Sequence, residues 1–79
     1  MAARPFKVRV FERQEQRAGE RARPGVELPE LALAVDASNC DRAAAEARAA
    51  LAAKSPTRQI LAVSHGRKDE VLVTVSRAS

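Results

Sequence analysis

The scarcity of large apolar side chains most limits what this chain can fold into. Seventeen of the 79 residues are Val, Leu, Ile or Phe, and another seventeen are Ala. A chain this short buries a smaller share of its surface than a larger domain, and small folds usually add a disulfide, a metal or a partner subunit. We therefore expect one small domain, residues 1–79, that gains stability from something beyond its own core.

The cysteine and histidine content narrows the choice of stabilising device. Cys40 is the only cysteine and His65 the only histidine, so an intrachain disulfide is impossible and a Cys/His zinc site would lack ligands. We expect no metal and no cofactor, and we expect self-association or a protein partner instead. The N-terminal residues lack the apolar stretch of a secretion signal, and no segment approaches the roughly 20 apolar residues of a membrane span. These patterns favour a cytoplasmic bacterial protein without membrane contact.

Alternation of apolar and charged residues over 6–12 predicts the first strand, half-buried in a sheet. The side chains expected in the core are Phe6, Val8 and Val10, and those expected on the opposite face are Lys7, Arg9 and Phe11. The following stretch is rich in Arg, Glu and Gln and has no large apolar residue, which is typical of solvated chain. We interpret residues 12–24 as a mobile charged loop and residues 77–79 as a flexible tail.

The remaining segments predict a second strand, a helix and a hairpin. Segments 26–28 and 31–35 keep a period of two, but Pro29 between them lacks an N–H for the ladder, so this strand should bend. A helix should start at 38–41 with Ser38 as its cap and end near Lys54, before Pro56. Its expected contact stripe is Cys40, Ala44, Ala47 and Leu51. Strands over 59–64 and 71–76, joined by the turn 65–70, complete an α+β fold of ββαββ order: a four-stranded, mainly antiparallel sheet with the helix on one face.

Residues able to perform catalysis are few and scattered. A thiol nucleophile needs a base, and His65 lies in a different predicted element from Cys40. The spacing of the carboxylates does not bring two of them together, and none of the three glycines belongs to a phosphate-binding pattern. We therefore expect no catalytic residues, no small-molecule substrate and no enzymatic activity.

The leading hypothesis for function is a homodimeric binding module that acts on a protein partner. An open sheet has two edges, and an exposed edge can accept a strand from another chain. Phe11 stands on the otherwise charged face with Lys7 and Arg9, where it is either a contact anchor or an ordinary exposed apolar residue.

Nucleic-acid binding is the alternative, because the net charge is +4. Cations that could follow phosphates are Lys7 and Arg9 on the first strand and Arg13, Arg17, Arg21 and Arg23 in the loop over 12–23. Against this, the chain has only two aromatic residues for base stacking, and glutamates interrupt the loop. The excess of Arg over Lys and the many alanines are also what GC-rich coding would produce.

Residues 26–51 carry a partial resemblance to a known family. The stretch Glu27-Leu28-Pro29-Glu30-Leu31, followed about ten residues later by an Ala/Glu-rich helix, is similar to the N-terminal module of HicB-type antitoxins, a partial RNase H-like fold. Ala32-Leu33 stand where that family has a glycine after its turn. Anti-CRISPR proteins share a helix against a short sheet at the level of fold only. An antitoxin-like or anti-CRISPR-like inhibitor is therefore a further alternative, and neither family is assigned.

Overall fold

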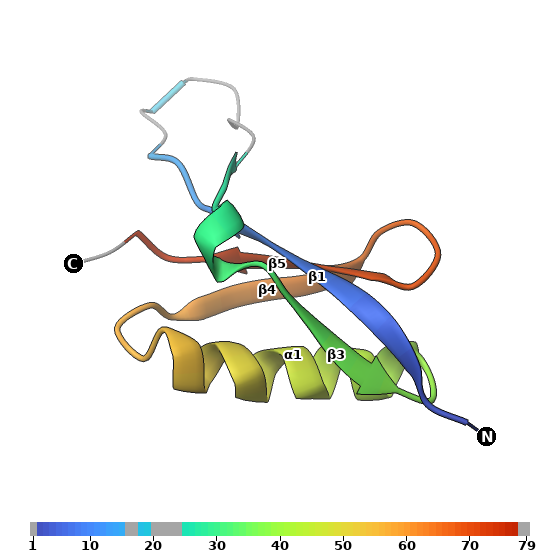
Figure 1. The fold of residues 1–79 in the computed structure, drawn as a ribbon. Helices are drawn as coiled ribbons and strands as arrows, with labels where there is room; N and C mark the ends of the chain where they lie inside the picture. Colours follow the sequence, from blue (N-terminus) through green and yellow to red (C-terminus); the bar gives the residue numbers. More distant parts are fainter. Residues whose placement is uncertain (1, 16–17, 20–24, 78–79) are drawn as a thin grey trace.

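The computed structural model describes residues 2–15, 18–19 and 25–77, in which one helix lies along one face of a single sheet (Figure 1). The elements are β1 (Arg4–Glu12), β2 (Val26–Glu27), the 3-10 turn η1 (Pro29–Leu31), β3 (Leu33–Ala37), α1 (Cys40–Lys54), β4 (Ile60–His65) and β5 (Glu70–Val75). The predicted α+β class with one helix is confirmed.

The sheet is mixed and has five strands rather than the predicted four. β2 and β3 both run antiparallel to β1, with Glu27 opposite Phe11 and Val35 opposite Phe6. They are two parts of the predicted second strand, which η1 interrupts at Pro29, as the missing N–H of proline requires. The order across the sheet is β2-β1-β5-β4, with β3 also beside β1.

The predicted mainly antiparallel sheet is matched in part, because three of the four strand pairings among the described residues are antiparallel and the central pair is not. β1 and β5 run parallel, with Val8 opposite Val71. Each of these strands belongs to an antiparallel pair, β1 with β3 and β5 with β4. α1 links the two pairs, and a helical crossover of this kind leaves β3 and β4 parallel at opposite edges. The alternation within each strand can be recognised in the sequence, but the relative direction of β1 and β5 depends on this crossover.

The core lies between the sheet and α1. Alternate residues of the two central strands face the helix and are almost inaccessible to solvent, as the period of two predicts for β1. The buried residues are Phe6, Val8 and Val10 of β1, Ala37 of β3, Ala43, Ala47 and Leu51 of α1, and Val71, Val73 and Val75 of β5. Leu51 is the only large apolar side chain on α1, and the small alanines allow the helix backbone to lie close to the sheet.

Two details of α1 differ from the sequence-based expectation. Its buried face contains Ala43, whereas Cys40 is exposed and Ala44 is only half-buried. Because most positions of this helix are alanine, the sequence has little hydrophobic contrast from which to read the contact face. The cap is Asn39, whose Oδ1 accepts a hydrogen bond from the Arg42 N–H at 2.9 Å, and not Ser38.

The predicted loop and tail lie largely outside the described residues. Glu12, the first residue of the predicted loop, is the last residue of β1. Residues 16–17, 20–24 and 78–79 are not described, so the predicted mobility of 12–24 and of 77–79 stays a prediction. Within the described ranges, no helix has the length and apolar character needed to cross a lipid bilayer.

Candidate interaction surface

The sheet face opposite α1, which we call the open face, holds the predicted contact residues. Lys7, Arg9 and Phe11 of β1 point to this side because their neighbours Val8 and Val10 are buried against α1. Strand pairing places further side chains beside them: Glu27 of β2, Ala34 of β3, Ala62 and Ser64 of β4, and Glu70, Leu72 and Thr74 of β5. All of these are half-buried or exposed.

Arg9 organises the charges at the centre of the open face. Its Nε and Nη2 donate to the two carboxylate oxygens of Glu27 at 3.1 and 2.7 Å, and its Nη1 lies 3.7 Å from Glu70 Oε2. A forked guanidinium–carboxylate pair fixes direction as well as charge. The hydrogen bond from Arg9 lowers the pKa of Glu27, and the same contact raises the pKa of Arg9. The charge of Arg9 is therefore compensated by its neighbours on the same face.

Phe11 is half-buried rather than projecting. The Arg9 guanidinium carbon lies 5.2 Å from the centre of its ring, within the range of a cation–π contact. Gly25 passes so close that a Cβ there would lie 3.0 Å from Phe11 Cβ and 3.1 Å from the Glu12 carbonyl oxygen. The structure thus brings Phe11 and Arg9 together, with Lys7 further along the same strand and exposed.

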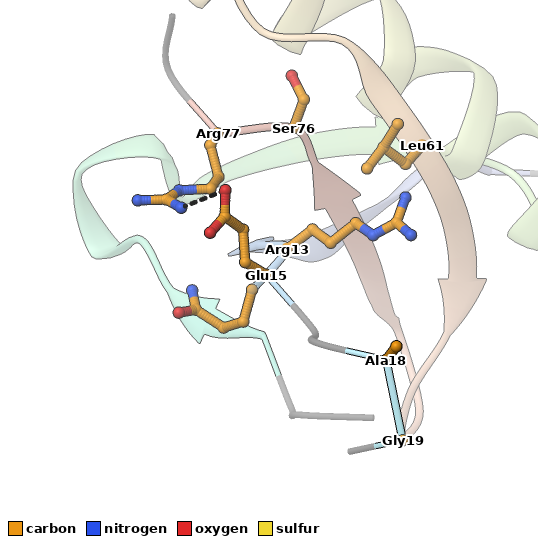
Figure 2. Close-up of a pocket in the computed structure, with 8 residues that line it drawn as sticks. Arg13, Glu15, Ala18, Gly19, Leu61, Ser76 and Arg77 are labelled. Atoms are coloured by element: carbon orange, nitrogen blue, oxygen red, sulfur yellow. Dashed lines mark ion pairs between the residues drawn. The ribbon is translucent and has the colours of Figure 1, made fainter. Parts of the chain in front are cut away.

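A hollow of about 580 Å³ lies where β1, β4 and β5 meet the start of the charged loop (Figure 2). Its lining residues are Arg13, Gln14, Glu15, Ala18, Gly19, Leu61, Ser76 and Arg77. Arg77 Nη1 lies 3.4 Å from Glu15 Oε1, and both side chains are mostly exposed. Of the four loop arginines proposed for nucleic acid, Arg13 lines this hollow, whereas Arg17, Arg21 and Arg23 are outside the described residues.

Several residues of the open face and of the hollow were not predicted from the sequence. Leu72 and Thr74 could have been found, because they alternate with the buried valines of the last strand. Glu27 could not, since its contact with Arg9 depends on a pairing between residues far apart in the chain. Arg77, which lines the hollow, was predicted to belong to the flexible tail over 77–79 and was not considered as a contact residue.

Metal-ligating side chains do not gather in the part of the chain that the structure describes. Among the described residues, no group of three or more His, Cys, Asp or Glu side chains is placed to hold a metal ion. Cys40 and His65 are both exposed. The acidic groups of the open face, Glu27 and Glu70, face Arg9 rather than each other.

Comparisons with known proteins do not assign the chain to a family. No protein-family model, no curated protein and no solved structure matches it. The partial likeness of residues 26–51 to the HicB-type module therefore remains a likeness of sequence pattern, and the open face is the basis on which a function can be argued.

Proposed function

We propose that this chain is a small protein-binding module and that its open face receives the partner. The observation that carries the proposal is the pairing of Arg9 with Glu27 and Glu70 between the apolar side chains Phe11 and Leu72. The buried centre of a protein interface has few uncompensated charges and contains apolar and aromatic groups with Arg. The open face has these properties before a partner arrives.

The charge balance of the open face favours a protein over a nucleic acid. Lys7 and Arg9 are matched on it by Glu27 and Glu70, whereas a surface that follows phosphates needs an excess of cations. Base stacking uses accessible aromatic rings. The chain has only two aromatic rings, of which Phe6 is buried in the core and Phe11 is half-buried with the guanidinium of Arg9 over one face. The net positive charge of the chain is carried elsewhere.

A capture experiment with matched variants tests the proposal. Leu72→Lys places an ammonium group at the centre of the open face, and Ala49→Lys places the same group on the exposed side of α1. The immobilised wild-type chain and the Ala49→Lys variant should retain the same partner, and the Leu72→Lys variant should retain at least tenfold less of it, because the added charge would be desolvated in the interface. Equal recovery by all three chains would contradict the proposal.

The antitoxin-like or anti-CRISPR-like role is one form of this function. The captured protein decides it, because an inhibitor of this kind would bind a toxin or a nuclease and would reduce that protein's activity in proportion to its occupancy. A partner without enzymatic activity would leave the binding function in place and exclude the inhibitor role.

Titration with a fluorescent duplex and a fluorescent single strand tests the nucleic-acid alternative. Binding carried by Lys7, Arg9 and the loop arginines would weaken by orders of magnitude between about 50 mM and 200 mM salt, since each phosphate contact releases counterions. We expect no such binding at either salt concentration. Tight, salt-sensitive binding that Lys7→Ala and Arg13→Ala both weaken would favour the alternative.

A further inference from the structure

We infer that β4 is a self-pairing edge: two copies of this chain join β4 to β4, antiparallel about Ser64, and form one continuous sheet. β4 borders the open face, which also holds Ala62 and Ser64, but the pairing uses the backbone groups of this edge rather than the side chains around Arg9.

The backbone hydrogen bonds show which groups of β4 point away from the sheet. The Gly66 N–H donates to the Glu70 carbonyl at 3.1 Å, and the Ser76 N–H donates to the Gln59 carbonyl at 2.8 Å. Even-numbered residues of β5 therefore direct their N–H and C=O groups toward β4. Because bonded and non-bonded pairs alternate in an antiparallel ladder, Ser64, opposite Leu72, is bonded to β5. The N–H and C=O groups of Val63 and His65 face outward.

The opposite edge of the sheet is less suited to pairing. It consists of β2, only two residues long, then η1 with Pro29, and then β3, which carries Asp36. The Ala32 carbonyl between η1 and β3 accepts a hydrogen bond from Lys54 Nζ at 3.4 Å. Short strands, proline and charged residues are the features that protect sheet edges from association. β4 contains neither proline nor a Lys, Arg, Asp or Glu residue, and its bulge between Ile60 and Ala62 lies outside the segment 63–65.

The absence of formal charge on β4 allows a second copy of this chain to pair with this edge. Two chains that each carry a net charge of +4 repel each other wherever cations meet. Among the strands that the structure describes, β4 is the one without a formally charged residue. Like charges directly opposite each other destabilise a strand pair, so two copies can meet at β4 without this cost.

Burial along β4 is incomplete on the side that faces the core. Val73 and Val75 of β5 are 0% and 2% exposed, whereas their partners on β4, Val63 and Ile60, are only partly buried. Leu61, at the register shift between Ile60 and Ala62, is 38% exposed and lines the hollow with Arg13 instead. α1 packs more closely on β3 than on β4. A strand added beside β4 would cover the exposed part of Val63.

Pairing about Ser64 satisfies the outward backbone groups symmetrically. Val63 of each copy comes opposite His65 of the other, so that each such pair exchanges two N–H···O=C bonds. The two Ser64 side chains meet on the open face, and the two helices lie on the other face of the joined sheet. The closed two-fold symmetry is that of the commonest soluble dimers.

Sedimentation equilibrium of the full chain and two variants at His65 tests the register. His65→Pro removes an outward N–H and leaves the bonds to β5 intact, as proline at an edge position allows. His65→Ala removes the same side chain and keeps the N–H. We expect a wild-type dimer, a dissociation constant raised about tenfold or more by His65→Pro through the loss of two symmetric bonds, and little change with His65→Ala. A folded wild-type chain that stays monomeric at all concentrations would overturn the inference.

A second pair of variants tests the same pairing if His65→Pro does not fold. Ser64→Lys brings two ammonium groups together at the symmetry axis, and Ala49→Lys places the same charge on the exposed side of α1. Ser64→Lys should weaken the dimer roughly tenfold at low salt and less at high salt, and Ala49→Lys should not. Equal effects of the two variants, or none, would overturn the assignment to β4.

Amide hydrogen exchange provides a readout that a dimer built elsewhere would not produce. As concentration rises, the Val63 and His65 amides should exchange more slowly, while the Ser64 amide, already bonded to β5, should be protected at every concentration. Concentration-dependent protection confined to another element would contradict pairing at β4.

Discussion

Arg9 determines the charge balance of the open face through its contacts with Glu27 and Glu70, which are distant from it in the sequence. Alternation along β1 correctly predicted its side of the sheet together with Lys7. The same pattern suggested an available cation, whereas the structure shows a guanidinium held by Glu27 and Glu70 and lying over Phe11. Side-chain direction follows from local period, but charge compensation follows from the pairing of β1 with β2 and β5, which the sequence does not display.

The Arg9–Glu27 pair should make stability depend on pH in the acid range. The pKa of Glu27 is lowered in the folded chain by the hydrogen bond from Arg9. The contribution of the Arg9–Glu27 pair to the free energy of unfolding is therefore fully present above the ordinary glutamate pKa of about 4.3. It is lost as pH falls through the lower pKa that Glu27 has in the folded chain. Urea denaturation should show a wild-type advantage over Glu27→Gln at pH 6 that shrinks as pH falls below about 4.

A double variant is the control for this pH effect. In an Arg9→Gln background, Glu27→Gln should change the slope of stability against pH in the acid range much less, since the hydrogen bond that is the main cause of the lowered pKa is absent and only the charge of Lys7 remains to lower it. An advantage of equal size at pH 6 and at pH 3 in the wild-type background would show that Glu27 acts by some other means.

At the scale of elements, α1 was predicted within two residues at each end, because its limits depend on local chemistry. Asn39 accepts the Arg42 N–H at the start, and Ser55-Pro56 follows the last residue, Lys54. The bend at Pro29 was also predicted from local chemistry, because proline has no N–H to donate to a neighbouring strand. The contact face of α1 was predicted only in part, because alanines on every side carry too little contrast to distinguish Ala43 from Ala44.

Removal of the helix cap should weaken the fold measurably. Asn39→Ala leaves the Arg42 N–H without its partner, and we expect a loss of about 1 kcal/mol in the free energy of unfolding. Asn39→Asp keeps an acceptor at the same position and should remain close to the wild type. Denaturant unfolding followed by circular dichroism checks both variants, and equal stability of Asn39→Ala and the wild type would show that the cap is dispensable.

Leu51 should be the most sensitive position of α1. It is 2% exposed, and the other buried residues of the helix are alanines. Leu51→Ala should cost about 2–5 kcal/mol through lost apolar contact and the cavity left behind, a large part of the stability of so small a domain. Leu61→Ala, at a position that is 38% exposed and outside the core, should cost less in the same urea titration, and similar losses at the two positions would contradict the described core.

At the scale of the whole molecule, the described residues form a sheet that α1 covers on one face, and the charges of β1, β2 and β5 on the other face balance one another. The α+β class followed from hydrophobic period and turn residues, and the predicted ββαββ order is roughly matched, because η1 divides the second strand into β2 and β3. The parallel pairing of β1 with β5, and with it the positions of Glu70, Leu72 and Thr74 beside the β1 side chains, depends on how the two strand pairs dock. Docking is decided by contacts between distant residues, so a single sequence could predict the candidate surface only in part.

The most direct test of the proposed function is a nuclear magnetic resonance titration of the isotope-labelled chain with the partner that it captures. We expect the largest changes in chemical shift on the amides of Arg9, Phe11, Leu72 and Thr74. Amides on the exposed side of α1, such as Ala49, should change little. Changes concentrated on α1, with the β1 and β5 amides unaffected, would contradict binding at the open face.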